Sequence, residues 1–221
     1  LLQLPLFQGL AQEDFTRILE KVKLHFTKHK PGELLLKEGT SCHELVFVLK
    51  GEVASSTSSV DSSYSFTEYF PAPYLIEAYS MFGMKTHYAS TYRAKTEAHT
   101  VSISKAFVMK ELFNYEIFRL NYMNIVSNRT QMLHNRLWAV SGDNLEARIA
   151  HFILSHVERL SDEKALKIKM ENLAQIVNDT RAGVSKALNS MQAKGLAELH
   201  RGEIVIPDAE KLSENLYQLS L

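Results

Sequence analysis

Residues Glu171–Gly195 read ENLAQIVNDTRAGVSKALNSMQAKG, and this stretch decides the fold of the C-terminal part of the chain. Its apolar residues recur at helical spacing in two runs, which predicts a short helix, a tight turn and a longer helix. Asn178 stands where the first helix must end, and asparagine tolerates the left-handed conformation that such a turn needs. Thr180 is a suitable N-cap for the second helix, which Gly195 ends.

Each of the two predicted helices has one apolar face. The Ala174–Asn178–Val184 spacing matches the helix-turn-helix template, in which a small residue, a turn residue and a branched apolar residue fix the crossing of the helices. A plain helical hairpin with a solvated polar face is the alternative. The residues expected to be buried are Leu173, Ala174, Val177, Val184, Leu188 and Met191.

The outward face of the second helix carries residues suited to DNA. Arginine reads guanine, asparagine reads adenine, serine and lysine hold phosphate, and a helix N-terminus attracts phosphate. Residues 197–208 (AELHRGEIVIPD) predict a β-hairpin with Arg201 at its tip, and a hairpin placed there makes a winged helix-turn-helix. The candidate DNA-binding residues are Thr180, Arg181, Gly183, Ser185, Lys186, Asn189 and Arg201.

The N-terminal half has a different texture. A helix is predicted over 12–23, and short runs rich in β-branched and aromatic residues between 24 and 104 predict an all-β roll. The polar stretch 54–65 reads as an exposed turn region, and 71–83 as a short helix after prolines.

Residues 105–138 contain no glycine or proline, and apolar residues recur there at spacings of three, four and seven. This predicts one long helix of about 30 residues, roughly 45 Å in length. Its stripe favours pairing with a second copy, and packing on the roll is the alternative. The candidate dimer-helix residues are Phe118, Tyr122, Ile125, Val126, Met132 and Leu133. Ser141–Asp143 is expected to break the helix, and a last helix is expected over Ala209–Leu219, capped by Asp208.

The predicted fold class is therefore α+β. It consists of an N-terminal β-roll of the double-stranded β-helix or jelly-roll type with its leading helix (1–104), a long connecting dimerisation helix (105–138), and a C-terminal winged helix-turn-helix (139–221).

Composition limits the function classes. The 25 Lys and Arg residues balance the 25 Asp and Glu residues, so any DNA affinity must come from local clusters. Cys42 is the only cysteine, which excludes a disulfide within the chain and a cysteine-ligated cluster. No membrane-length apolar run and no signal peptide are found, so we expect a cytoplasmic protein. Phosphate-cradling, HExxH and nucleophile-elbow motifs are absent from the sequence, so no enzyme is expected.

Several segments, taken in order, resemble the Crp/Fnr family of bacterial transcription regulators. They are LPLFQGLAQEDF (4–15), KPGELLLKEG (30–39), ELVFVLKGEV (44–53), TYRAKTEAHTVSIS (91–104) and LAQIVNDTRAGVSKALNSMQAKGL (173–196). The resemblance implies a homodimer that reads a palindromic site on double-stranded DNA, and an effector domain that shifts the DNA-binding helices. RNA polymerase is a further expected partner.

This sequence departs from relatives that bind cyclic AMP, in which a Gly-Glu pair and an Arg-Ser or Arg-Thr pair hold the ribose and the phosphate. An alignment without gaps places Glu77-Ala78 and Tyr88-Ala89 there. The arginine is missing and Glu77 would repel a phosphate, so we predict no tight cyclic AMP binding. The candidate effector-pocket residues are Glu77, Ala78, Tyr79, Tyr88, Ala89 and Thr91, and the alternative is that they only fill the interior of the roll.

The effector therefore stays unidentified, and no cofactor is predicted. His87 is a conceivable heme ligand, but a lone histidine in a loop is more often polar surface. In the second helix, Arg181-Ala182 replaces the Arg-Glu pair common in the family, so the DNA half-site should differ. The alternative function is a small-molecule sensor whose helical domain contacts a protein, and the salt dependence of binding separates the two.

Overall fold

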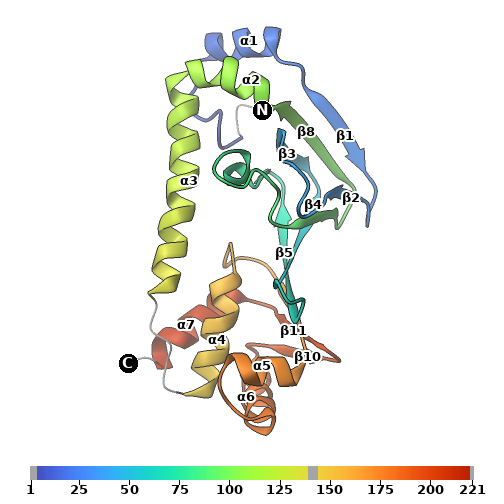
Figure 1. Ribbon diagram of the computed structural model, residues 1–221, viewed down its shortest axis with the longest axis vertical. Helices are drawn as coiled ribbons and strands as arrows, with labels where there is room; N and C mark the ends of the chain where they lie inside the picture. The colour runs from blue at the N-terminus through green and yellow to red at the C-terminus, as the bar shows by residue number, and fades with distance from the viewer. Residues whose placement is uncertain (1–3, 139–143, 220–221) are drawn as a thin grey trace. The chain divides into compact units, whose positions relative to one another are not determined.

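The computed structural model describes residues 4–138 and 144–219 (Figure 1). The chain divides into two compact units, which we call the N-terminal unit (residues 1–54 and 70–135) and the C-terminal unit (residues 55–69 and 136–221). None of the helices in the described ranges is long and apolar enough to cross a membrane. The expected break at Ser141–Asp143 lies outside the described residues.

The N-terminal unit is the expected roll. Its helices are α1 (Gln12–Lys21), α2 (Lys105–Lys110), α3 (Glu116–Leu137) and the 3₁₀ helices η1 (Ala78–Met81) and η2 (Leu112–Asn114). Its strands are β1 (His25–His29), β2 (Leu34–Leu36), β3 (Glu44–Lys50), β6 (Tyr74–Ile76), β7 (Thr91–Ala94) and β8 (Ala98–Ser104). Strands β4 (Glu52–Ser58) and β5 (Tyr64–Pro71) belong to it only in part, because residues 55–69 are assigned to the C-terminal unit. One sheet has the order β1-β8-β3-β6, with antiparallel pairing throughout, and β4, β7 and β2 follow one another in the second sheet. Phe47, Val101 and Ile103 are buried between them.

The prediction of one helix over 105–138 was wrong. The chain forms α2, η2 and α3 instead, with an extended residue, Tyr115, before α3. Tertiary packing overrides the helical pattern, because Leu112 is fully buried and the ring of Phe113 packs against Tyr122, 5.6 Å away between ring centroids. The amide of Asn114 also donates to the carbonyl of Lys110 and so satisfies the end of α2.

The reading of 54–65 as an exposed turn was wrong for most of its length. Strands β4 and β5 occupy both ends of this stretch, and only the residues between Ser58 and Tyr64 form the turn. The serine-rich composition hid the strands because their hydroxyls are paired within the hairpin, as Ser56 is with Thr67 at 2.9 Å. The expected helix over 71–83 is reduced to the short η1.

The C-terminal unit is a helical domain with a small sheet. Its elements are α4 (Leu145–His156), β9 (Lys164–Ile168), α5 (Met170–Ile176), α6 (Arg181–Ala193), β10 (Glu198–His200), β11 (Glu203–Ile206) and α7 (Ala209–Leu219). The hairpin and last helix are confirmed, and Asp208 caps α7 through the backbone N–H of Lys211 at 3.1 Å. Strand β9 was not predicted.

The tip of the β4–β5 hairpin completes this small sheet. Strand β5 pairs antiparallel with β9 from Tyr64↔Ile168 to Glu68↔Lys164, which gives the order β10-β11-β9-β5. The ring of Phe66 joins the core of the C-terminal unit and is only 5% exposed. We call residues 55–69 the hairpin tip.

Candidate nucleic-acid interface

The turn between α5 and α6 has the geometry that its sequence predicts. Asn178 has a φ of 50°, so it adopts the left-handed conformation expected at the end of α5. The backbone N–H of Asp179 donates to the carbonyl of Ala174 at 2.9 Å, which closes the turn. The expected buried residues are all buried, among them Val184 and Leu188.

Two residues that the sequence did not single out hold this turn against α4. The Nε of Arg148 donates to the carbonyl of Val177 at 3.0 Å, and its guanidinium pairs with the carboxylate of Asp179 at 2.8 Å. The only sequence signal was their charge, because α4 and the turn are separated by some 30 residues and no local rule joins them. The pair fixes where α6 begins.

Helix α6 starts as expected at Thr180, whose hydroxyl accepts from the N–H of Gly183 at 3.0 Å. The sequence suggested that Gly183 lets the backbone approach a phosphate. The structure adds a packing reason, since a Cβ there would lie 2.4 Å from the Oδ1 of Asp179. The same Oδ1 accepts from the N–H of Thr180 at 2.7 Å, so it is not free to move away.

The face of α6 turned to solvent carries the candidate base-reading residues. Arg181, Lys186 and Asn189 are exposed, and Ser185 is half-buried. Arg181 is already oriented, because its Nε lies 3.2 Å from the Oε1 of Glu171 on α5. Both side chains are well exposed, at 71% and 58%, so a phosphate or base can compete for the guanidinium.

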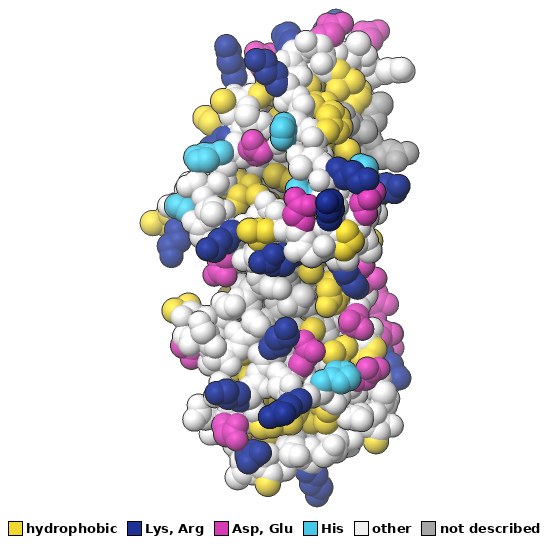
Figure 2. All heavy atoms as spheres, turned by 90° about the vertical axis from the view of Figure 1, so that its right-hand side faces the viewer, with side chains coloured by type: hydrophobic (Ala, Val, Ile, Leu, Met, Phe, Trp, Pro, Cys, Tyr) yellow, Lys and Arg dark blue, Asp and Glu magenta, His cyan; other side chains and the backbone are white. Residues whose placement is uncertain are grey.

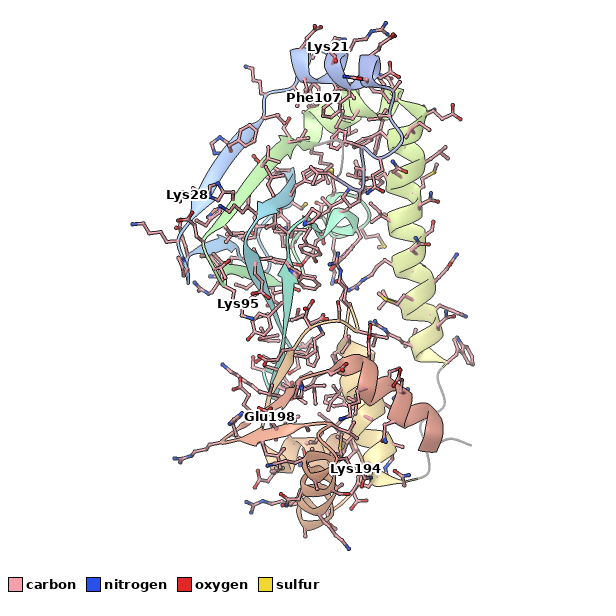
Figure 3. The ribbon with its side chains drawn as sticks, turned by 180° about the vertical axis from the view of Figure 1, so that it is seen from behind. Lys21, Lys28, Lys95, Phe107, Lys194 and Glu198 are labelled. Atoms are coloured by element: carbon pink, nitrogen blue, oxygen red, sulfur yellow. The ribbon has the colours of Figure 1, made fainter. Side chains whose placement is uncertain are left out.

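The wing adds a second element to this surface. Arg201 is exposed at the β10–β11 turn, where Gly202 has a φ of 77°. A groove of about 190 Å³ lies between the wing and the β9–α5 junction, with Arg181 of α6 at its side. Its charged lining is mixed and comprises Lys169, Glu171, Arg181, His200 and Glu203. Lys194, directly after α6, donates to the carboxylate of Glu146 (Figure 3). Glu198 lies on β10 of the wing.

Charge on the surface is mixed rather than uniformly basic. Figure 2 shows Lys and Arg side chains interspersed with Asp and Glu on one face of the molecule. This agrees with the formal net charge of zero. A polyanion would therefore be held by a few placed cations rather than by a broad positive field.

The predicted effector-pocket residues gather around η1 in the N-terminal unit. Glu77, Ala78 and Tyr88 are buried, whereas Tyr79 and Thr91 are half-buried and Ala89 is exposed. An open cavity of about 500 Å³ is lined by Tyr79, Lys85, His87, Tyr88 and neighbouring residues. Burial raises the pKa of Tyr88, whose hydroxyl donates to the carbonyl of Glu44 at 3.3 Å.

Glu77 is turned inward rather than into this cavity as a free charge. Its Oε2 accepts from the N–H of Ala89 at 2.7 Å and from the hydroxyl of Ser80 at 2.7 Å, and its Oε1 accepts from the N–H of Ser90 at 2.9 Å. The side chain is only 2% exposed. Among the described residues, no group of three or more His, Cys, Asp and Glu side chains is placed to hold a metal ion.

The structure separates the six candidate dimer-helix residues into two groups. Phe118 and Tyr122 are buried in the core of their own N-terminal unit, so they are not available to a second copy. Ile125, Val126 and Met132 are half-buried and Leu133 is 45% exposed. The sequence pattern placed core and surface residues in one stripe because both recur at helical spacing. The apolar residues of α3 that are most exposed are Leu120, Met123, Leu133 and Leu137.

Comparison with known proteins agrees with this architecture. Residues 26–115 match the cyclic nucleotide-binding domain, and residues 147–214 match the Crp-like helix-turn-helix domain. The chain is 21% identical to the CRP-like cAMP-activated global transcriptional regulator of Mycobacterium tuberculosis, over 94% of each chain.

Two solved structures share the fold. The catabolite activator protein of Thermus thermophilus is 16% identical, with a TM-score of 0.50 and coverage of 97% of this chain and 99% of that one. FixK2 of Bradyrhizobium japonicum is 14% identical, with a TM-score of 0.51 and coverage of 90% and 98%.

A cyclic nucleotide-binding domain followed by a Crp-like helix-turn-helix domain defines a class of DNA-binding transcription regulators. This chain belongs to that class, the Crp/Fnr family.

Proposed function

We propose that this regulator is a homodimer that reads a roughly two-fold symmetric DNA site through α6, under the control of a roll domain that does not take cyclic AMP. The exposed row of Arg181, Lys186 and Asn189 on α6 carries the proposal. Arg181 contacts a base, and Lys186 contacts a phosphate or a base, while Arg201 on the wing contacts the backbone. The N-terminus of α6, capped by Thr180, faces a phosphate.

The homodimer forms along α3. Leu120 and Met123 are 43% and 53% exposed on a helix that is otherwise anchored to its own roll. Apolar side chains repeated along a helix face favour a partner helix, and a second copy presents the same face. Two copies of α6 related by a two-fold axis would then meet half-sites about one helical turn of DNA apart.

Cyclic AMP is not the effector. The relative from Mycobacterium tuberculosis carries cAMP activation in its name, but here Tyr88 stands where an arginine is expected. The carboxylate of Glu77 lies against the N–H groups of Ala89 and Ser90. These N–H groups are therefore not available to a nucleotide phosphate, and the negative charge of Glu77 would repel one.

The test is selection of bound duplexes from a random DNA pool, with purified protein and no added ligand at moderate salt. An enriched palindrome establishes DNA reading, and titration of the winning duplex with cyclic AMP should leave the affinity unchanged. The affinity should also fall steeply with salt, as phosphate contacts require.

Enrichment of no sequence, with or without a cell extract, would contradict the proposal. It would favour the alternative in which the helical domain contacts a protein. RNA polymerase is the partner expected at a promoter, and its recruitment is tested on the selected site.

A further inference from the structure

The most unusual group in the N-terminal unit is the buried carboxylate of Glu77. Three donors surround it: the consecutive backbone N–H groups of Ala89 and Ser90, and the hydroxyl of Ser80, all between 2.7 and 2.9 Å away. Two successive N–H groups that point at one anion form an anion-binding site even without a side-chain cation. We call this site the anion niche.

Burying the carboxylate of Glu77 in the niche costs free energy. No ion pair to Glu77 is found in the part of the chain that the structure describes, so hydrogen bonds alone offset the cost of burying the charge. The backbone of Glu77 has a φ of 35°, a left-handed conformation that costs a non-glycine residue energy. The three hydrogen bonds hold the carboxylate in place despite this strained backbone.

The niche is connected to α3 through the residues that follow Glu77. The hydroxyl of Tyr122 on α3 donates to the carbonyl of Ala78. The guanidinium of Arg129, also on α3, lies 5.3 Å from the centre of the Tyr79 ring. The two residues that contact α3 thus directly follow Glu77 in the chain.

We propose that Glu77 is a built-in ligand of the roll: its carboxylate fills the anion niche and keeps η1 docked on α3, so that the protein needs no anionic effector to bind DNA. The link to DNA binding rests on the function proposed above, whereas the occupancy of the niche by an anion is independent of that function. Removal of the carboxylate should convert the niche into a receptor for a small anion such as formate or acetate.

The first arm of the test measures thermal unfolding of the full chain. Glu77→Ala should lower the Tm by about 5 °C or more, and formate or acetate should restore it in a concentration-dependent way that chloride at equal ionic strength does not reproduce. Glu77→Gln should also be destabilised, because its amide N–H₂ meets N–H donors, but its side chain still fills the niche and should block rescue.

The control is Glu52→Ala, which removes a half-buried glutamate whose ion-pair partner is Lys95. Wild type and this control should show no formate-specific change. An unchanged Tm in Glu77→Ala, or a response to formate no larger than in the control, would overturn the niche. If the alanine variant does not fold without an anion, refolding yield with formate against chloride gives the same answer.

The second arm measures affinity for the selected duplex by fluorescence anisotropy. Wild type should bind without added ligand, and Glu77→Ala should bind at least tenfold more weakly until formate is added. Equal binding by the variant without formate would overturn the role of the niche in DNA binding. Failure of the wild type to bind any duplex would instead refute the proposed function, and the first arm would still decide whether the niche is an anion site.

Discussion

The carboxylate Oε1 of Glu68 lies 3.8 Å from the ammonium Nζ of Lys164, and both side chains are buried inside the C-terminal unit. Glu68 also accepts from the N–H of Glu158 at 2.7 Å and from that of Arg159 at 3.3 Å, while Lys164 donates to the carbonyl of Ser161. Burial raises the pKa of Glu68 and lowers the pKa of Lys164. Each charge therefore depends on the other to remain in the core.

Removal of one partner should cost much more than removal of both. Glu68→Gln leaves a buried lysine without its carboxylate and should lower the free energy of unfolding by about 3–5 kcal/mol. The double variant Glu68→Gln, Lys164→Met keeps an oxygen for the N–H of Glu158 and should cost less than the sum of its single changes. Urea unfolding of the four proteins of this double-mutant cycle measures the interaction free energy between Glu68 and Lys164. Strictly additive changes in the free energy of unfolding would show that the two side chains do not stabilise one another.

Docking of the hairpin tip should weaken in acid. The Nδ1 of His156 donates to the carbonyl of Phe152 at 2.8 Å, so its Nε2 accepts from the hydroxyl of Tyr64 at 3.0 Å, and this requires a neutral ring. Burial lowers the pKa of His156 below its usual 6.5. Its contribution to stability is thus present above pH 6.5 and is lost as the pH falls through the folded-state pKa.

His156→Gln removes the titration of this side chain. All other titrating groups are the same in the variant and in the wild type, so the difference between the two pH profiles reports His156. The free energy of unfolding of the wild type should fall relative to the variant as the pH falls below about 6.5. Glu68, whose raised pKa gives the opposite trend, is present in both proteins and cancels in the difference. Parallel pH profiles would show that folding does not lower the pKa of His156.

Arg181 and its partner should have opposite effects on DNA binding. Arg181→Ala should weaken binding to the selected site by about 1–3 kcal/mol and relax the preference at one base pair. Glu171→Gln removes a carboxylate 3.2 Å from the guanidinium and should strengthen binding, because that carboxylate repels phosphate. Competition binding with single-base variants of the site measures both, and an unaltered base preference in Arg181→Ala would assign Arg181 to the backbone.

Gly183→Ala should disturb the start of α6 without touching its exposed face. The new Cβ would meet the Asp179 carboxylate, which Arg148 and the N–H of Thr180 hold in place. Overpacking of this kind costs about 1–3 kcal/mol. The Tm should fall in Gly183→Ala and stay near wild type in the neighbouring exposed variant Ala182→Ser. Equal Tm values would mean that the turn rearranges to accommodate the new Cβ without a loss of stability.

A charge on the exposed face of α3 should prevent dimerisation. Leu120→Glu and Met123→Glu place like charges opposite one another in a symmetric pair, while Asn128→Glu adds the same charge at a polar exposed position of α3. Sedimentation at micromolar concentration should give monomers for the first two and a dimer for the third. A wild type that sediments as a monomer would remove the homodimer from the proposal.

Local rules predicted the DNA-reading part of the fold well. The left-handed Asn178, the Thr180 cap and the buried Val184 each follow from residues fewer than five positions away. Local rules failed where contacts between residues far apart in the sequence determine the local structure. The packing of Phe113 and Leu112 in the roll interrupts the helical pattern before α3, and no periodicity within that segment reveals it.

Long-range pairing also explains what was missed at the sites. The alignment placed Glu77 and Ala89 in one pocket, and the structure brings them together, but the hydrogen bond that fills the niche depends on the strained backbone of Glu77. Arg148 on α4 pairs with Asp179 in the turn between α5 and α6, and no local sequence rule joins residues so far apart. The partner of β5 lies in β9, beyond α3 and α4, so polarity alone made the hairpin tip look like a loop.

The pairing of β5 with β9 has a consequence for how this protein can be engineered. A gene fragment that begins after α3 would encode a sheet with β9 as a bare edge and a core without Phe66, and bare edges invite aggregation. Recombination with a relative at that junction would pair β9 with the hairpin tip of another protein. The two halves of the gene are therefore not interchangeable modules, and a graft must carry residues 55–69 with the DNA-reading helices.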